Sequence, residues 1–88
     1  MVKLAIVQPD GSTETIEQNA DPTLAQYYSW LDCSMIEYVP IDDSWELITD
    51  EEALVRSDKT PVRNQAVFGL TGLVIVGAAA LQPAGTLK

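Results

Sequence analysis

Short strand-like runs separated by turn-forming residues make up much of this chain, and they limit it to a small sheet with short connections. Residues 2–7 are aliphatic and β-branched, and the Pro-Asp-Gly-Ser sequence at 9–12 is typical of a turn. Residues 13–17 then alternate in a strand-like way. The opening segment therefore predicts an antiparallel hairpin with a polar outer face.

A second hairpin is indicated by residues 35–41 and 45–49, which are strand-like and flank an Asp-Asp-Ser turn at 42–44. Pro40 has no amide hydrogen to give to a sheet ladder, so we expect it at a sheet edge or at a strand end. The two hairpins supply four of the expected strands.

The best helical signal lies just after the first hairpin. Asp21 offers an N-cap, and Pro22 suits the first helical position. Apolar side chains then recur at helical spacing, at Leu24, Tyr27, Tyr28 and Leu31. This stripe predicts a helix whose Leu24, Tyr28 and Leu31 face the sheet.

Two aromatic side chains of this helix, Tyr27 and Trp30, fall nearer the margin of the buried face. There each is either a core residue or a contact anchor for a partner. We favour core packing for both and keep the contact role as the alternative.

The second half of the chain has weaker signals. Residues 50–52 are three consecutive acids, suited either to the positive end of a helical turn or to a solvated loop. We expect a loop at 57–60, a short helix at 61–68 and a final strand at 73–81 that is continuous enough to be central in the sheet. Residues 82–88 predict a loose tail.

Together these segments predict a single α+β domain over residues 1–81. The expected architecture is a small, mostly antiparallel sheet of about five strands, with one main helix packed on one face and a second short helix. No internal repeat or second domain is evident. A chain of 88 residues builds one core with a small stability margin, so a homo-oligomer is a reasonable expectation.

The acidic residues are separated from the basic ones along the sequence. Thirteen Asp and Glu stand against five Lys and Arg, for a formal net charge of −8. Twelve of the acids lie between residues 4 and 55, where there is no basic residue, and from Lys59 onward there are three basic residues and no acid. Helical i,i+4 ion pairs are therefore impossible within the acidic part. Its carboxylates are solvated, paired with the C-terminal basic residues, used on a basic protein partner, or arranged to mimic phosphates.

This charge distribution disfavours two classes of partner. Phosphate contacts require clustered Lys and Arg, so we expect no direct binding to DNA or RNA. Anionic membrane surfaces are disfavoured by the same repulsion. The uncharged stretch 66–81 is sixteen residues long and is interrupted by three glycines, so it predicts a buried segment and not a membrane span.

Residues suited to catalysis are scarce. The chain has no histidine and one cysteine, which removes the common catalytic triads, imidazole metal sites and any internal disulfide. Cys33 has no nearby Lys or Arg to activate it, so we expect a buried or half-buried structural thiol. Residues 50–52 lack the ligand spacing of a calcium loop, and no glycine-rich phosphate loop is present. We therefore expect no enzyme, no catalytic residue, no metal and no cofactor.

The expected location follows from similar features. The first residues lack the long apolar segment of a secretory signal, and a lone cysteine offers no disulfide framework. We therefore expect a cytoplasmic protein.

Five short motifs occur in the order seen in an uncharacterised protein family. They are Val-Gln-Pro-Asp-Gly at 7–11, Met-Ile-Glu-Tyr-Val-Pro-Ile at 35–41, Asp-Glu-Glu at 50–52, Pro-Val-Arg-Asn-Gln-Ala at 61–66 and Leu-Val-Ile-Val-Gly at 73–77. On these motifs the chain resembles the domain of unknown function 3846, which is found in bacteriophages and in bacteria carrying mobile elements. The resemblance spans about residues 3–81.

The resemblance implies a small α+β domain of phage or prophage origin, with no established activity or catalytic residues to carry over. The three consecutive acids at 50–52 form an acidic step that the family shares. The chain departs from the family's pattern after this step, where residues 53–57 stand in place of the family's glycine. Asn64 matches the family's asparagine, for which we favour a helix or turn cap over a ligand contact.

Three non-enzymatic functions remain open. We favour a small acidic phage-type accessory protein that binds a host protein, in host takeover or anti-defence, within the host cytoplasm. The alternatives are a binder that sequesters a nucleotide signal, which requires the mid-chain basic residues to gather at a pocket, and a virion or capsid-associated subunit. The candidate contact residues are Tyr27, Trp30, Asp50, Glu51, Glu52, Arg56, Lys59, Arg63 and Asn64.

Overall fold

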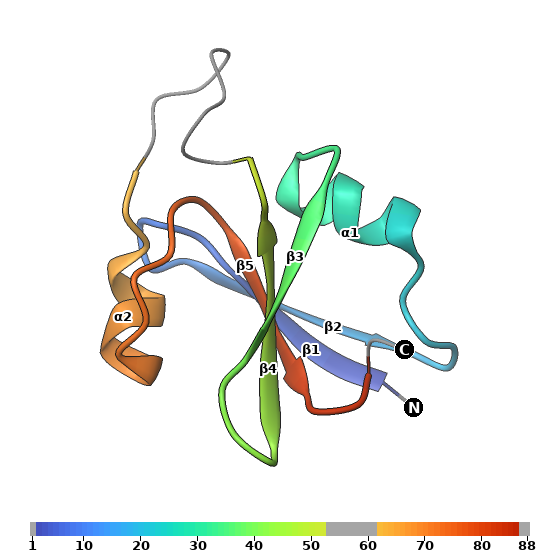
Figure 1. Ribbon diagram of the computed structural model, residues 1–88. Helices are drawn as coiled ribbons and strands as arrows, with labels where there is room; N and C mark the ends of the chain where they lie inside the picture. Colours follow the sequence, from blue (N-terminus) through green and yellow to red (C-terminus); the bar gives the residue numbers. More distant parts are fainter. Residues whose placement is uncertain (1, 53–61, 87–88) are drawn as a thin grey trace.

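The structure is a computed structural model that describes residues 2–52 and 62–86. Its elements are β1 (Val2–Val7), β2 (Thr13–Gln18), α1 (Leu24–Leu31), β3 (Ile36–Pro40), β4 (Trp45–Asp50), α2 (Gln65–Thr71) and β5 (Ala79–Pro83). The strands form one antiparallel sheet, and the two helices lie on its opposite faces (Figure 1). The predicted α+β class, with a small sheet and two helices, is confirmed.

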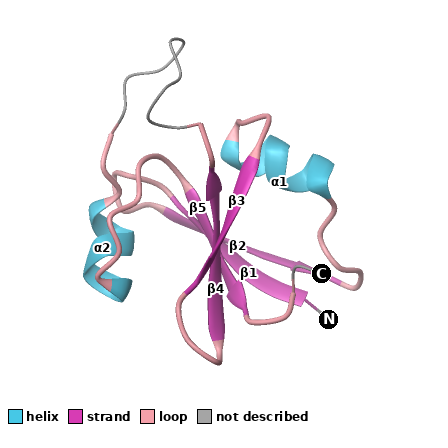
Figure 2. Cartoon of the chain, in the orientation of Figure 1, coloured by secondary structure: helices cyan, strands magenta, loops and turns pink. Residues whose placement is uncertain are grey.

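The sheet has the strand order β2-β1-β5-β4-β3, and every neighbouring pair is antiparallel (Figure 2). Both predicted hairpins are present, and β5 joins them by lying between β1 and β4. Ala80 in β5 is opposite Ile6 on one side and Ile48 on the other. β3 is an edge strand, which confirms the position expected for Pro40.

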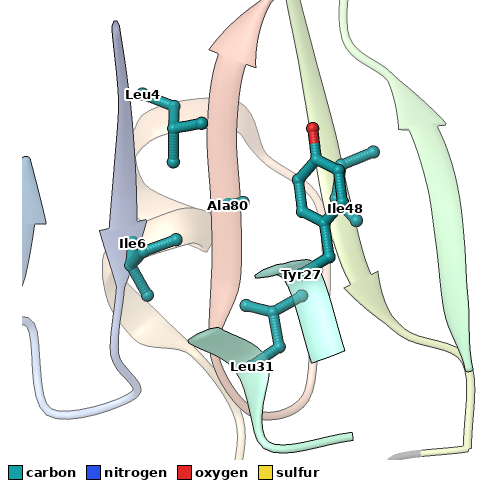
Figure 3. Close-up of a cluster of buried hydrophobic side chains, with 6 residues drawn as sticks. All are labelled: Leu4, Ile6, Tyr27, Leu31, Ile48 and Ala80. Atoms are coloured by element: carbon teal, nitrogen blue, oxygen red, sulfur yellow. The ribbon is translucent and has the colours of Figure 1, made fainter. Parts of the chain in front are cut away.

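Helix α1 covers one face of the sheet and builds a core there. The buried cluster consists of Leu4, Ile6, Tyr27, Leu31, Ile48 and Ala80 (Figure 3). Tyr27 and Leu31 are one helical turn apart and project together onto the strands. Full burial of a large apolar side chain stabilises a fold by about 1.5–3 kcal/mol, so these two residues attach α1 to the sheet.

The predicted contact face of α1 was wrong in part. Tyr27 lies at the centre of the core with no exposed surface, whereas Leu24, expected to face the sheet, is 53% exposed. Trp30 is half buried and meets Tyr27 edge to face, with ring centroids 5.6 Å apart. The reason is that the Tyr27 hydroxyl has a buried partner in Gln82, 55 positions away in the sequence.

The start of α1 also differs from the prediction. The N-cap is Thr23, not Asp21. The Thr23 hydroxyl oxygen accepts from the Gln26 backbone N–H at 3.2 Å, and Gln26 Oε1 accepts from the Thr23 backbone N–H at 3.0 Å. This capping box satisfies two backbone donors at once, which favours Thr23 over a single aspartate cap.

Helix α2 packs on the other face of the sheet, over a second core. The buried members of that core are Val7, Leu47, Val67 and Ala79. The helix begins at Gln65 after the N-cap Asn64 and ends before Gly72, which has a positive φ of 76°. It therefore lies further along the chain than the predicted helix at 61–68. Pro61, the expected first residue, is outside the described residues, as is the loop expected at 57–60.

The final strand is central, as predicted, but it starts later than residue 73. Its bounds are Ala79–Pro83. The chain before it is irregular and forms one isolated antiparallel bridge, between Val76 and Arg63. Gly77 then adopts a φ of +81°, a conformation that interrupts a strand and favours glycine.

A row of polar side chains lies within the α1-side core. The Tyr27 hydroxyl donates to Gln82 Oε1 at 2.7 Å, and Gln82 Nε2 donates to Glu46 Oε2 at 2.7 Å. The Gly85 N–H donates to Glu46 Oε1 at 2.8 Å. Gln82 and Glu46 are opposite each other in the sheet and are at most 1% exposed. The row holds the chain in place beyond residue 81, so Gln82 and Pro83 belong to β5 and not to the loose tail that we expected there.

Replacing Tyr27 with phenylalanine tests the polar row. We expect Tyr27→Phe to lower the free energy of unfolding by about 1–2 kcal/mol, because Gln82 Oε1 would remain buried without its donor. Tyr38→Phe is the matched control: Tyr38 is 49% exposed, and its loss should be within about 0.5 kcal/mol of zero. Urea unfolding followed by circular dichroism measures both, and equal losses would contradict a stabilising hydroxyl at Tyr27.

The pH dependence of stability gives a second test of the same residue. Burial raises the pKa of Tyr27 above its ordinary value, although the Gln82 hydrogen bond acts in the opposite direction. As pH rises above about 10, the unfolded chain therefore loses this proton before the folded protein does. The contribution is complete below that pH, and the free energy of unfolding should fall above it. Unfolding at a series of pH values should show the gap between wild type and Tyr27→Phe shrinking above about pH 10; a constant gap would contradict the raised pKa.

Candidate functional site

A surface cleft of about 310 Å³ opens on the α2 side of the sheet, where β3 begins and β4 ends. Its lining residues are Glu37, Thr49, Asp50, Glu51, Arg63, Val74, Ile75 and Val76. One wall is the open end of the β3–β4 hairpin, away from its turn. The other wall is formed by the segments just before and after α2. Figure 2 shows the loop between α2 and β5 on the same side of the sheet as α2.

The strand wall is positioned by the register of β3 and β4. Glu37 is opposite Thr49, which in turn is opposite Ala79 of the α2-side core. Directly opposed residues project to the same face of an antiparallel sheet, so Glu37 and Thr49 both face the cleft. The Glu51 N–H donates to the Met35 carbonyl at 3.1 Å, which continues the pairing one step beyond β4. Glu51 therefore lies on the same face as Glu37.

The second wall is a short ribbon held together by backbone bonds. Arg63 and Val76 form an antiparallel bridge, and the Asn64 N–H donates to the Ile75 carbonyl at 2.7 Å. Gly77 ends the ribbon, because its positive φ turns the chain toward β5. Three consecutive apolar residues, 74–76, thus line the cleft opposite the carboxylates.

The cleft has an excess of negative charge. Three carboxylates and one guanidinium line it, a formal charge of −2. Between described residues the one ion pair joins Lys3 and Glu17, at 3.6 Å on the exposed face of the β1–β2 hairpin. Arg63 therefore lines the cleft without closing onto a carboxylate there, and the walls offer acidic groups beside Val74, which is 59% exposed.

The acidic step at 50–52 forms the end of β4 and a turn, and the helical turn considered after it, at 53–55, lies outside the described residues. Asp50 is the last residue of β4, and its Oδ1 accepts from the Glu52 N–H at 2.9 Å. Glu52 Oε1 in turn lies 3.5 Å from the Ser34 hydroxyl. Asp50 thus shapes the turn at the cleft's edge, while Glu51 presents its side chain to the cleft.

Asn64 is fully buried and joins three parts of the fold. Its Nδ2 donates to the carbonyls of Val7 and Gly77, each at 2.9 Å, and its Oδ1 accepts from the Val67 N–H at 3.0 Å. The side chain thereby connects the end of β1, the start of α2 and the ribbon before β5. Both ends of the amide are occupied, so Asn64 has the capping role favoured from the sequence and does not face the cleft.

Three of the predicted contact residues, Asp50, Glu51 and Arg63, meet at the cleft. Glu52 lies beside it in the turn. Arg56 and Lys59 lie outside the described residues.

The aromatic candidates Tyr27 and Trp30 belong to the α1 side of the sheet, away from the cleft. Their packing is the core role that we favoured for them. Cys33 is half buried against the same core, as expected for a structural thiol.

Sequence reasoning missed Glu37 and the apolar wall. Glu37 had a usable signal, because it is the one charged residue within the run 35–41 and strand alternation gives it a face. Residues 74–76 had no such signal. An uncharged apolar stretch predicts a buried strand, even where one of its faces is exposed to solvent.

A second hollow, of about 330 Å³, lies on the same sheet face at the opposite end of β4. It is lined by Lys3, Leu4, Ala5, Thr15, Trp45, Leu81 and Pro83. Trp45 is 46% exposed and lies opposite Pro83 in the sheet. This hollow is mainly apolar and does not involve the predicted contact residues.

Neither a metal-binding group nor a membrane-spanning helix is found in residues 2–52 and 62–86. No group of three or more Cys, Asp or Glu side chains is arranged to hold a metal ion in that part of the chain. Nor does it contain a helix long and apolar enough to cross a membrane.

Comparison of the chain with protein-family models, with curated proteins and with solved structures finds no match in any of the three.

Removing the Asn64 amide tests its structural role. We expect Asn64→Ala to lower the free energy of unfolding by about 2–3 kcal/mol, because it removes a helix cap and the amide donor to the buried Val7 carbonyl and the partly buried Gly77 carbonyl. Gln65→Ala is the neighbouring control, since Gln65 is exposed and should change stability by less than about 0.5 kcal/mol. Urea unfolding measures both variants, and a loss no larger than that of the control would overturn the assigned role.

Proposed function

We propose that this protein is a non-enzymatic binding module whose cleft takes a basic segment of a partner protein. The observation that carries the proposal is the cleft itself, where Glu37 and Glu51 project from one wall and apolar residues form the other. Lysine and arginine side chains match such a site, because their apolar stems pack on hydrophobic surface while their charged ends reach carboxylates.

The charge of the whole chain supports the same class of partner. A net charge of −8 creates a negative field that attracts a basic segment at long range and accelerates its association. Such binding weakens as salt rises.

We propose a host protein as the partner, in keeping with the resemblance to a phage family. In this role the protein would act as an accessory factor in the host cytoplasm, and it would carry out no chemistry of its own. The motif order across residues 3–81 is the support for this part of the proposal.

A pocket for an anionic nucleotide is less well supported. Such a ligand requires several cations around its phosphates. In the described residues Arg63 shares its cleft with three carboxylates, which would repel a phosphate group. The geometry therefore favours a cationic ligand over an anionic one.

Selection from a random peptide display library tests the proposed partner class. We expect the selected peptides to be rich in Lys and Arg and poor in Asp and Glu. The double substitution Glu37→Gln with Glu51→Gln should weaken their binding about fivefold, given two partly exposed ion pairs. The matched control, Glu14→Gln with Asp43→Asn, removes the same charge from exposed sites outside the cleft lining and should weaken binding less than about twofold.

Two results would count against the proposal. Selected peptides without net positive charge would contradict a basic partner. Equal weakening of binding in the two double variants would show that the cleft is not the binding site. The variant Arg63→Gln distinguishes a basic peptide from an anionic nucleotide as the ligand of the cleft. Loss of this positive charge should preserve or strengthen binding of a basic peptide, whereas it would weaken binding of a nucleotide.

A further inference from the structure

We infer that the basic segment of the partner binds in an extended conformation, as an added β-strand along the outer edge of β3. This inference rests on the proposed function and specifies how the partner is held. Its starting observation is that β3 is the last strand on its side of the sheet (Figure 1). No described residue pairs with its outer side.

The pairing pattern identifies which backbone groups point outward. The Ile41 N–H donates to the Trp45 carbonyl at 3.1 Å, and the Glu51 N–H donates to the Met35 carbonyl at 3.1 Å. These bonds mark residues 35 and 41 as hydrogen-bonded partners of β4. Because such pairs alternate with non-bonded ones along an antiparallel ladder, residues 37 and 39 also bond to β4.

The remaining residues of β3, namely Ile36, Tyr38 and Pro40, therefore direct their backbone groups away from the sheet. Ile36 and Tyr38 each offer an N–H and a carbonyl, while Pro40 offers a carbonyl alone. An unpaired row of this kind is a template for another strand. Pro40 ends the row of donors, so the edge accepts a short segment.

The side chains beside this edge select the composition of the added strand. Glu37 projects to the cleft side, next to a site with excess negative charge. Tyr38, which is 49% exposed, projects to the other side. An added strand has the same alternation, so its cationic side chains would lie by Glu37 and its apolar side chains by Tyr38.

Charge selects a basic segment over a second copy of this chain. Two copies joined at β3 would bring acidic strands together at a net charge of −8 each, and like charges across strands are destabilising. The other edge strand, β2, carries the exposed acids Glu14 and Glu17 but does not line the acidic cleft beside β3. It serves as an internal control.

Amide hydrogen exchange, followed by NMR on the full chain, tests the inference. The probe is a capped peptide of alternating lysine and valine. In the free protein the N–H groups of Ile36 and Tyr38 should exchange rapidly, whereas those of Glu37 and Val39 are protected by β4. Saturating peptide should slow Ile36 and Tyr38 by at least about tenfold and leave the outward amides of Thr15 and Glu17 in β2 unchanged.

A second peptide, N-methylated on alternate residues, is the matched control, because it keeps the charge but loses half of its backbone donors. Its binding should be at least about tenfold weaker, the effect of one lost hydrogen bond or more. If the first peptide binds in a manner sensitive to Glu37→Gln with Glu51→Gln but leaves Ile36 and Tyr38 unprotected, strand addition is wrong and the proposed function stands. If basic peptides do not bind at all, the proposed function fails as well. Protection of Ile36 and Tyr38 that rises with protein concentration in the absence of peptide would assign the edge to a second copy and overturn the inference.

Discussion

The α2 side of the molecule depends on the buried amide of Asn64. Helix α2 has seven residues, too few for an isolated helix to be stable in water. It is held because Asn64 caps its first turn and donates to the ends of two other segments, at Val7 and Gly77. The same connection positions the ribbon that forms one wall of the cleft. The proposed binding surface is thus supported by a side chain that does not reach it.

The sequence was sufficient for those parts of the fold that depend on neighbouring residues. Both hairpins follow from alternation and turn chemistry, which act over a few positions. The face of α1 was not predictable in the same way, because the Tyr27 hydroxyl is buried against Gln82, 55 positions away. The bounds of β5 were missed for a related reason: Gln82 is buried by its bonds to Tyr27 and Glu46, and a polar residue near proline looks like part of a tail.

The candidate site shows the same division between local and distant information. The acidic step and the nearby basic stretch identified Asp50, Glu51 and Arg63, which do line one cleft. Their meeting with Glu37 depends on the register of β4 against β3 and on the bridge between Arg63 and Val76. Neither the register nor the bridge can be derived from composition, so the sequence indicated several members of the site but not its walls.

The position of β5 has a consequence for how the chain folds during synthesis. The two hairpins are local in sequence, but they are joined only through the strand made after both of them. Until β5 emerges from the ribosome, each hairpin has an open inner edge and an uncovered apolar face, which are the features that lead nascent chains to aggregate. In this interval the carboxylates concentrated on the two hairpins would repel those of neighbouring nascent chains. The negative charge of the acidic part thus opposes association between incomplete sheets.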